Sequence, residues 1–296
     1  MQAEEFIAHI NALNVWKKGD QRAPHKPLLL LLALARIAGD QTRLIPFNEI
    51  EKKLSQLLQD FGPSRTSYHP ELPFWHLQSD GIWEIPNTTG VLSSSGSISK
   101  KYLRDHNVMA GLTPEAYDLL KANPNLLEQT ALQLLEDNFP LSIHQDILDE
   151  VGLAFEAMPQ LSLQKRPKRD PSFRRRVLEA YDYRCAVCSF SVRMENIPIA
   201  LEAAHIKWFQ AGGPDIESNG LALCSLHHKL LDRGALAISK EHKIVVSEKA
   251  NGHGGFQEWV LNFHDKALQK PRNPSYAPKT EFTEWHIREV FQGKYH

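Results

Sequence analysis

The fold is decided by a stretch that reads Cys185-Ala-Val-Cys188, then Glu202-Ala-Ala-His205-Ile206, Asn219-Gly220 and finally Cys224-Ser-Leu-His227-His228. This stretch contains all 3 cysteines of the chain. C-x-x-C followed by C-x-x-H is the ligand spacing of a tetrahedral zinc site. The alternative is a set of buried thiols beside an incidental histidine, but three thiols cannot all pair as disulfides. The spacing favours a structural zinc ion bound by Cys185, Cys188, Cys224 and His227.

Between the two ligand pairs the sequence predicts a strand, a loop and a helix. Residues 199–206 are strand-like, residues 210–220 are rich in turn-forming residues, and residues 221–231 have a helical pattern. A knuckle of this length buries little apolar surface. We therefore expect bound zinc to supply much of its folding free energy.

Inside this frame a histidine, an asparagine and a second histidine follow in the order found in HNH endonucleases. Residues 183–238 resemble the ββα-metal finger of that family. The resemblance implies that His205 is the general base, because an imidazole titrates near working pH. It implies that Asn219 holds His205 by hydrogen bonds across the loop. It also implies that His228 binds a catalytic divalent cation, Mg²⁺ or Mn²⁺, which stabilises charge on the transition state.

The neighbours of these residues complete the expected site. His227 and His228 point about 100° apart on a helix, so one can bind zinc while the other serves the reaction. Asp232 lies on the same helical face as His228, which makes it the candidate second ligand of the catalytic cation. Many family members carry a metal ligand just before the general base, and here that position is Ala204. Glu202 is a poorer substitute, because its side chain leaves the opposite face of the strand from the base.

The bulk composition fits a soluble globular protein of about two domains. Of 296 residues, 42% are hydrophobic and 23% are charged, and no apolar run approaches the ~18 residues of a membrane span. The start of the chain lacks the basic segment of a signal peptide, so we expect a cytoplasmic protein. Residues 1–160 carry 13 Lys and Arg against 20 Asp and Glu, which gives −7; residues 161–296 carry 21 against 15, which gives +6. The second part is therefore the expected nucleic-acid partner.

Composition also suggests the domain boundaries. Residues 1–160 are expected to form the first domain and residues 177–296 the second. The basic, proline-punctuated segment 161–176 is the linker and then opens a helix; its cations either line a solvated hinge or clamp the DNA backbone. The first domain should be mainly helical, with a hairpin over residues 74–85 that turns at Asp80-Gly81. The expected fold class is α+β: a mainly helical N-terminal DNA-recognition domain with a small hairpin, plus a C-terminal zinc-stabilised ββα-metal HNH domain.

Two segments of the first domain carry a second resemblance. They read Arg22-Ala-Pro-His25-Lys26-Pro27 and Ser67-Tyr68-His69-Pro70-Glu-Leu-Pro-Phe74-Trp75. Together with Asp80-Gly-Ile-Trp-Glu-Ile85, they resemble the sulfur-binding domain of phosphorothioate-dependent type IV restriction enzymes, over about residues 5–155. That family binds DNA in which sulfur replaces one non-bridging phosphate oxygen. Sulfur is weakly hydrated, so an apolar pocket accepts it more readily than it accepts oxygen.

This second resemblance implies roles for individual residues. The sulfur pocket would be formed by Tyr68, His69 and Pro70. The phosphate would be held by Arg22, His25 and Lys26. Two further contacts with the DNA backbone would come from Ser94 and Lys100. Core packing is the structural alternative for Tyr68. An exposed helix entry is the alternative for His25 and Lys26.

Together these patterns predict a modification-dependent restriction endonuclease. It would bind phosphorothioate-modified double-stranded DNA and hydrolyse phosphodiester bonds near the mark by a one-metal HNH mechanism. One active site cuts one strand, so a double-strand break would need a homodimer or two molecules. One alternative is an HNH nuclease that reads another modification, such as a methylated base. The other is a DNA sensor that binds without cutting, which Ala204 would explain.

Overall fold

The chain forms two structural units, and each is described by itself. The computed structural model describes residues 1–15, 19–87, 98–155 and 170–295. Unit 1 comprises Met1–Asn138 and His144–Ser162, and unit 2 comprises Phe139–Ile143 and Leu163–His296. No described helix is both long and apolar enough to cross a membrane.

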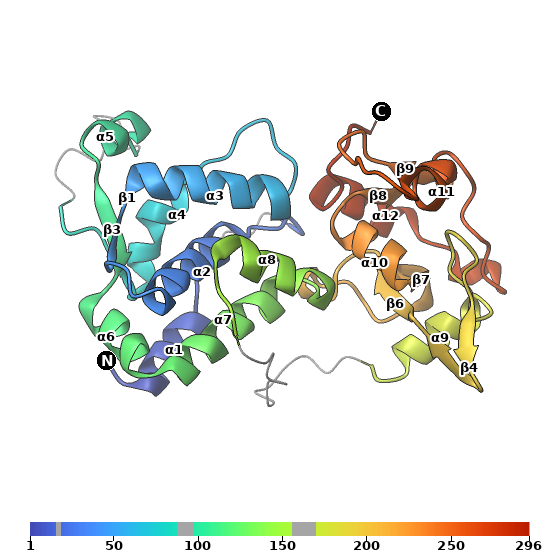
Figure 1. Ribbon diagram of the computed structural model, residues 1–296, viewed down its shortest axis with the longest axis horizontal. Coiled ribbons are helices and arrows are strands. Elements are labelled where there is room, and N and C mark those ends of the chain that lie inside the picture. Colours follow the sequence, from blue (N-terminus) through green and yellow to red (C-terminus); the bar gives the residue numbers. More distant parts are fainter. Residues whose placement is uncertain (16–18, 88–97, 156–169, 296) are drawn as a thin grey trace. The chain divides into compact units, whose positions relative to one another are not determined.

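Helices make up most of unit 1 (Figure 1). They are α1 (Ala3–Asn11), α2 (His25–Ala38), α3 (Phe47–Phe61), α4 (Glu71–His76), α5 (Lys100–Asp105), α6 (Pro114–Ala122), α7 (Pro124–Asn138) and α8 (His144–Val151). An antiparallel sheet in the order β1-β3-β2 completes the unit, with β1 at Leu44–Pro46, β2 at Trp83–Glu84 and β3 at Met109–Leu112. The mainly helical N-terminal architecture expected from the sequence is confirmed.

The central helix of unit 1 is α2. Its residues 28–34 are all apolar and all buried, so it is covered on every side. Pro27 lies in its first turn, where a missing backbone amide costs no intrahelical hydrogen bond. By contrast α3 is amphipathic and buries one apolar face, which includes Ile50, Leu54 and Leu57. These two helices form much of the core on which the N-terminal loops rest.

The hairpin predicted over residues 74–85 is wrong. Residues Glu71–His76 form α4, and a 3-10 turn over Leu77–Asp80 continues it. Gly81 ends this helical segment with a φ of 78°, a left-handed value that glycine adopts without a Cβ clash. The Asp-Gly pair is therefore a helix C-terminus, a use of glycine that the local sequence does not distinguish from a hairpin turn.

A buried ion pair ties α2 to this segment. Lys26 Nζ lies 2.5 Å from Asp80 Oδ2, and the two side chains are only 10% and 3% exposed. The other carboxylate oxygen accepts a hydrogen bond of 2.8 Å from the backbone amide of Asn14. Both buried charges thus have a compensating partner, as low-dielectric surroundings require.

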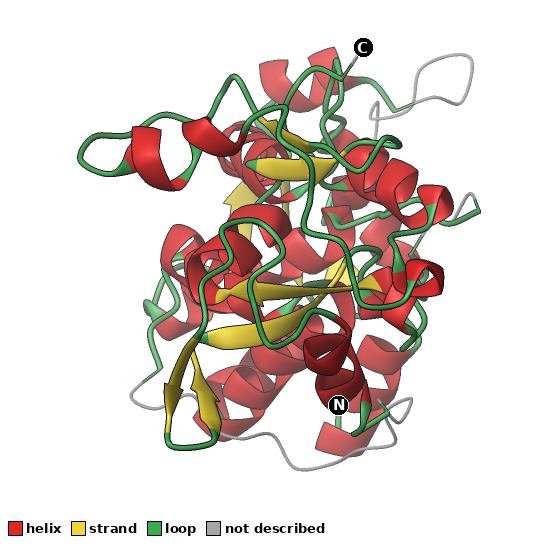
Figure 2. Ribbon diagram, turned by 90° about the vertical axis from the view of Figure 1, so that its right-hand side faces the viewer, coloured by secondary structure: helices red, strands yellow, loops and turns green. Residues whose placement is uncertain are grey.

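Unit 2 combines short antiparallel strand pairs with helices (Figure 2). Its elements are α9 (Phe173–Ala180), β4 (Val192–Met194), β5 (Ile197–Ile199), β6 (Leu201–His205), β7 (Gly220–Cys224), α10 (Ser225–Asp232), β8 (Leu236–Ile238), β9 (Ile244–Val246), α11 (Phe256–Trp259) and α12 (Thr280–Glu289). The strands pair as β4-β5, β6-β7 and β8-β9. The order β6-β7-α10 is the ββα arrangement expected for the C-terminal domain.

The helix predicted over residues 221–231 is wrong in its first half. Residues 220–224 form β7, which pairs with β6 from Leu201 opposite Cys224 to His205 opposite Gly220. All of β7 is buried, and α10 begins only at Ser225. A short apolar run fits either a buried strand or a buried helix, and here the partner strand β6 decides.

The buried Lys26–Asp80 pair yields a test of the unit 1 core. Asp80→Asn should lower the free energy of unfolding by about 3 kcal/mol, because it leaves an uncompensated charge inside the unit. Urea unfolding followed by circular dichroism measures this loss. Asp105→Asn is the matched control, since the exposed Lys101–Asp105 pair should contribute little. Equal stability of the two variants would contradict a structural role for the buried pair.

Candidate functional site

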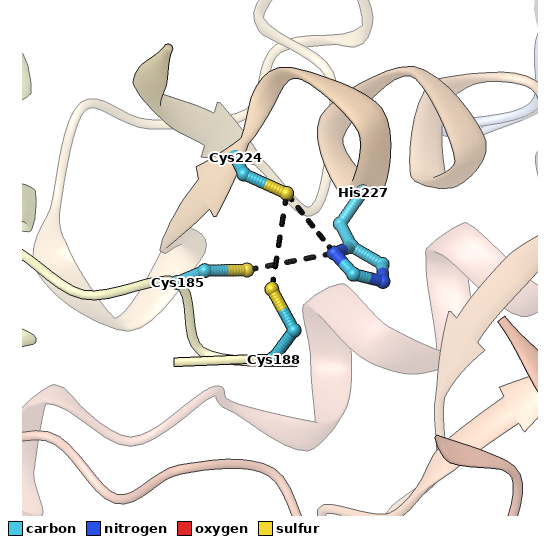
Figure 3. A group of neighbouring side chains, drawn as sticks. All are labelled: Cys185, Cys188, Cys224 and His227. Carbon is cyan, nitrogen blue, oxygen red and sulfur yellow. Dashed lines mark hydrogen bonds between the residues drawn. The ribbon is translucent and has the colours of Figure 1, made fainter. Parts of the chain in front are cut away.

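Three thiols and one imidazole converge on a common point in unit 2 (Figure 3). His227 Nδ1 lies 3.1 Å from Cys224 Sγ and 3.7 Å from Cys185 Sγ, and the sulfurs of Cys188 and Cys224 are 4.0 Å apart. Tetrahedral zinc with Zn–S bonds of about 2.3 Å places its sulfurs ~3.8 Å apart. The cluster is therefore consistent with a zinc site. Within the residues that the structure describes, it is the one group of three or more His, Cys, Asp or Glu that gathers in this way.

Local structure presents each ligand of this Cys3His cluster. The Cys185–Cys188 turn is closed by backbone hydrogen bonds of 2.9 Å, including one from Ser189 to the carbonyl of Cys185. Cys224 is the last residue of β7, and His227 lies in the first turn of α10. His227 Nε2 lies 2.9 Å from the carbonyl oxygen of Trp259. A carbonyl partner on one ring nitrogen directs the other nitrogen towards a metal.

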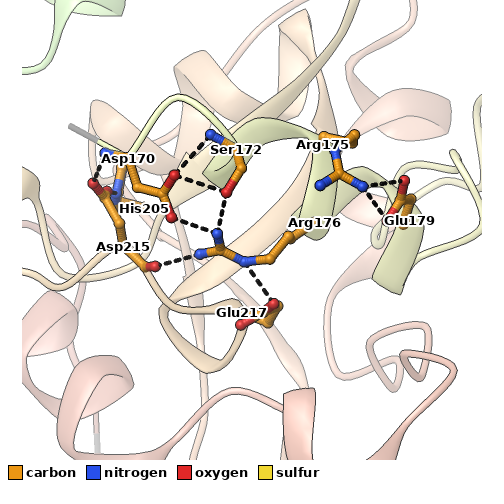
Figure 4. Close-up of polar contacts among 8 residues, drawn as sticks. All are labelled: Asp170, Ser172, Arg175, Arg176, Glu179, His205, Asp215 and Glu217. Carbon is orange, nitrogen blue, oxygen red and sulfur yellow. Dashed lines mark hydrogen bonds and ion pairs between the residues drawn. The ribbon is translucent and has the colours of Figure 1, made fainter.

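His205, the predicted base, lies at the end of β6 beside a carboxylate that the sequence analysis did not single out (Figure 4). Its Nε2 is 2.7 Å from Asp215 Oδ1, and the two side chains are 15% and 12% exposed. Phe173 of α9 stacks on the imidazole, with ring centroids 4.2 Å apart and planes at 17°. The ring is thus held both at its face and at one nitrogen.

Asn219, the predicted positioning residue, is fully buried and binds the loop that follows His205. Its Oδ1 accepts a hydrogen bond from the Lys207 amide at 2.8 Å. Its Nδ2 donates to the carbonyls of Lys207 and Pro214, both at 3.0 Å. The side chain therefore crosslinks both ends of the loop, the geometry expected of a residue that fixes the backbone around the base.

His228, the predicted metal ligand, lies between two carboxylates. Its Nδ1 is 2.5 Å from Glu202 Oε2, and its Nε2 is 3.1 Å from Asp232 Oδ2. Asp232 is almost wholly buried and also accepts a hydrogen bond from Ser142. Burial lowers the pKa of His228, but hydrogen bonds with Asp232 and Glu202 outweigh burial and raise it to about 10. The three side chains concentrate negative charge around one imidazolium.

The predicted base and the predicted metal ligands lie on opposite faces of the β6–β7 ribbon. His205 meets Phe173 of α9, and His228 reaches Glu202 from α10 on the other face. The sequence argument against Glu202 was correct about the faces. It did not foresee that α10 covers the face of Glu202. Ala204 is fully buried in the core and offers no ligand, so Glu202 supplies the acid of β6 beside His228.

The described part of the basic segment, α9 and its entry, uses its arginines within the protein. Arg174 donates to the carbonyl of Leu201 at 3.0 Å, and Arg175 pairs with Glu179 at 3.2 Å. Arg176 pairs with Asp170 and Glu217. Residues 161–169 lie outside the described residues, so the solvated-hinge and DNA-clamp interpretations of this segment both stay predictions.

In unit 1, the structure gathers a charged group around Glu71 at the start of α4. His69 Nδ1 lies 2.9 Å from Glu71 Oε1, and Lys100 Nζ lies 3.7 Å from Glu71 Oε2. Burial lowers the pKa of His25 to about 4, helped by the nearby His69 and Arg65 and opposed by Glu71. His25 is thus neutral at pH 7. We call His25, Arg65, His69, Glu71 and Lys100 the His69 cluster.

The other predicted recognition residues are placed differently. Tyr68 is half-buried and Pro70 is buried, both next to His69. Arg22 donates to the carbonyl of Phe61 at 2.9 Å, at the end of α3. Lys26 is not in the His69 cluster, because its charge is paired with Asp80 in the core. Ser94 lies outside the described residues.

Comparison with known proteins now decides the family. A family model described as ScoMcrA-like, DNA sulfur-binding domain matches residues 3–156, and a model described as HNH endonuclease matches residues 185–239. The first match spans more than half of the chain. The chain belongs to the family with a ScoMcrA-like DNA sulfur-binding domain. In this ScoMcrA-like protein the domain is joined to an HNH endonuclease domain.

Solved structures similar to this ScoMcrA-like protein include the sulfur-binding domain of ScoMcrA complexed with phosphorothioated DNA. That chain is 23% identical with a TM-score of 0.44, and the match covers 50% of this chain and 95% of that one. The type IV phosphorothioation-dependent restriction endonuclease ScoMcrA is 22% identical with a TM-score of 0.42, over 50% of this chain and 32% of that one. The modification-dependent TagI restriction endonuclease is 28% identical with a TM-score of 0.31, over 40% and 38%. Among curated proteins none matches.

Sequence reasoning missed several residues of these sites. Asp215 came within a loop that was described only by its turn-forming residues, although Gly-Gly-Pro-Asp ends that turn with an acid. Glu71 stood inside the Ser67–Trp75 segment without an assigned role, and Arg65 lay just before it. The signal that could have found these residues is an acidic or basic side chain a few residues along the sequence from a candidate site histidine.

The Cys3His cluster of this ScoMcrA-like protein yields a test. Cys188→Ser should release bound zinc and destabilise unit 2, because a lost thiolate weakens the metal that closes the knuckle. Metal analysis by mass spectrometry and thermal unfolding measure the two effects. The exposed Ser191→Ala, three residues after Cys188, is the control and should keep the metal. Full zinc retention in Cys188→Ser would contradict this ligand set.

Proposed function

We propose that the protein is a phosphorothioate-dependent DNA endonuclease, in which unit 1 binds the modified linkage and unit 2 hydrolyses a phosphodiester bond near it. The observation that carries this proposal is one polypeptide with a ScoMcrA-like DNA sulfur-binding domain and an HNH domain whose His205, Asn219 and His228 each have suitable partners. ScoMcrA, a type IV phosphorothioation-dependent restriction endonuclease, is a solved precedent for the activity.

The His69 cluster is the proposed recognition site for the modified linkage. A phosphorothioate keeps its negative charge but presents a weakly hydrated sulfur, so its binding site needs apolar surface beside a cation. Half-buried Tyr68 and the exposed Leu72 offer apolar surface around His69, and buried Pro70 lies between them in the sequence. Arg65 offers the cation, with Lys100 beside Glu71. Neutral His25 adds a hydrogen-bonding group without charge.

In unit 2 we propose that His205 is the general base. Its Nε2 is engaged by Asp215, so its Nδ1 would accept the proton of the attacking water. Asn219 would hold the loop, and with it the base, during the reaction. The base and the cation site serve different oxygens of the scissile phosphate, because attacking and leaving oxygens lie on opposite sides of phosphorus. Their placement on different faces of the ribbon is compatible with that division.

The catalytic cation would be held by His228 and a carboxylate. Oxygen and imidazole ligands suit Mg²⁺ or Mn²⁺, and such an ion stabilises charge on the phosphate and the leaving oxygen. Glu202 and Asp232 contact opposite nitrogens of the ring, so only one of them can share an ion with His228. We propose Glu202, because its side chain is 45% exposed and open to a phosphate. Buried Asp232, the ligand expected from the sequence, would then orient the ring.

The remaining assignments follow from the ligand chemistry. We propose zinc for the Cys3His cluster, since thiolates favour it over hard cations. Reduced thiols in a zinc site suit a reducing compartment such as the cytoplasm. The proposed partner is double-stranded DNA. Since one active site cuts one strand, a double-strand break would need a homodimer or two molecules.

The first prediction concerns recognition. A duplex with a single phosphorothioate linkage should bind at least tenfold more tightly than the same duplex without it, about 1.4 kcal/mol. Fluorescence anisotropy at one fixed salt concentration measures this ratio, because backbone binding depends steeply on salt. Tyr68→Ala should reduce the ratio, and Tyr117→Ala on α6 should preserve it. Equal affinity for both duplexes would exclude sulfur recognition and turn attention to a methylated base.

The second prediction concerns cleavage. His205→Ala should lower the cleavage rate by at least 100-fold in Mg²⁺ or Mn²⁺, because no base then activates water. His228→Ala should do the same while retaining zinc, and Glu202→Gln should raise the metal concentration needed for half-maximal rate more than Asp232→Asn does. Gel assays on a phosphorothioate duplex measure these rates. The exposed His253→Ala is the control. Unchanged cleavage in His205→Ala would remove the catalytic assignment of His205, and absent cleavage by the wild-type protein would favour a sensor that only binds.

A further inference from the structure

We infer that Asp215 is the positioning residue that sets the orientation and the tautomer of His205, and that Arg176 and Asp170 hold Asp215 in place. The inference rests on the proposed nuclease function, because these residues act through the proposed base. Figure 4 shows the side chains converging at the entry to α9 and the loop before Asn219.

The first step is the contact between His205 and Asp215. A neutral imidazole carries its proton on one nitrogen and its basic lone pair on the other. A carboxylate only accepts hydrogen bonds, so Asp215 Oδ1 at 2.7 Å from Nε2 requires the proton to be on Nε2. The lone pair is then on Nδ1. Because the pair is largely shielded from water, this preference is stronger than it would be at the surface.

The second step is that the ring has little freedom besides its tautomer. Phe173 stacks on one face of the imidazole at 4.2 Å and limits rotation of the ring. The backbone of His205 pairs with Gly220, and a Cβ at Gly220 would lie 2.4 Å from Val177 Cγ2. The strand is therefore seated closely on α9. With the ring plane set by α9, Asp215 decides which nitrogen is basic.

The third step is that Asp215 is itself fixed by its other oxygen and by its backbone. Its Oδ2 accepts a hydrogen bond of 2.7 Å from the backbone amide of Asp170. Its carbonyl accepts one of 2.7 Å from Arg176 Nη2. The preceding carbonyl, of Pro214, accepts one from Asn219 at 3.0 Å. Both carboxylate oxygens and the peptide groups beside them thus have defined partners.

The fourth step assigns Arg176 to this network. Its guanidinium spans Asp170, Ser172 and Glu217 as well as the Asp215 carbonyl, with Nε 2.8 Å from Glu217 Oε1. The planar fork of arginine satisfies several acceptors at fixed angles, which the point charge of lysine does not. Hydrogen bonds from Arg176 and Ser172 lower the pKa of Asp170 to about 2, so the pair remains ionised at working pH. Arg176, which contacts the backbone of Asp215, therefore serves positioning.

The test uses Asp215→Asn, which keeps the shape of the side chain but removes its charge and adds a donor. The cleavage rate constant on a phosphorothioate duplex should fall at least 100-fold, about 2.7 kcal/mol. Duplex affinity, zinc content and melting temperature should change little. Asp215→Glu should recover part of the rate, since it restores an acceptor. Asp265→Asn is the matched control, because its carboxylate lies beside an exposed histidine, His264, and should be silent.

A readout independent of activity follows the tautomer itself. Long-range ¹H–¹⁵N spectra of the full-length wild-type protein should show His205 protonated at Nε2, and Asp215→Asn should shift it towards Nδ1. A wild-type His205 protonated at Nδ1 would overturn the inference even if the variant failed to fold. Full cleavage activity in Asp215→Asn alongside an inactive His205→Ala would also overturn it and leave the proposed function intact. Full activity in His205→Ala would instead refute the proposed base, and absent cleavage by the wild-type protein would refute the proposed function.

Arg176→Lys tests the outer part of the network. It keeps the positive charge near Asp170 but loses the fork that spans Asp215 and Glu217. We expect a smaller fall in the rate constant than for Asp215→Asn, on the order of tenfold, with unchanged duplex affinity. A loss confined to duplex affinity would show that Arg176 contacts the DNA backbone and does not position Asp215.

Discussion

The register between β6 and β7 is the constraint on which the rest of unit 2 depends. It places Gly220 opposite His205, where any larger residue would collide with Val177 of α9. A slip by one residue would turn each side chain of β6 to the other face. The imidazole would then leave Asp215, and Glu202 would leave α10. One pairing therefore assembles two sites on opposite faces, although the ribbon itself is only two short strands.

Two short strands do not hold such a register alone. The Cys3His cluster ties the Cys185–Cys188 turn to the end of β7 and the start of α10, where the ribbon would otherwise fray. His227 and His228, adjacent residues near the start of α10, then contact different groups. His227 faces the thiols, and His228 faces the carboxylates. A structural metal at this place would thus also orient the helix that carries the proposed catalytic ligand.

The sequence predicted what depends on local chemistry. Cys and His spacing identified the cluster, and the order of His205, Asn219 and His228 located the proposed reaction. Contacts between distant segments were beyond it. The strand face from which Glu202 projects was inferred correctly. That α10 covers this face was not inferred, so the contact between Glu202 and His228 was missed. Lys26 is a second example. The family resemblance assigned this cation to phosphate, but it pairs with Asp80, a buried acid far along the chain.

The contrast between His205 and His228 shows how one residue type can supply both a base and a cation site. The carboxylate of Asp215 contacts His205 at Nε2, which favours Nδ1 as the basic nitrogen. Two carboxylates contact His228, one at each nitrogen, and they raise its pKa to about 10 against the effect of burial. At neutral pH such a ring is an imidazolium and accepts no proton. The two negative charges of Glu202 and Asp232 exceed the single positive charge of the imidazolium. A divalent cation that replaces the proton would therefore balance these negative charges better. The carboxylate contacts of the two rings thus accord with the two proposed roles.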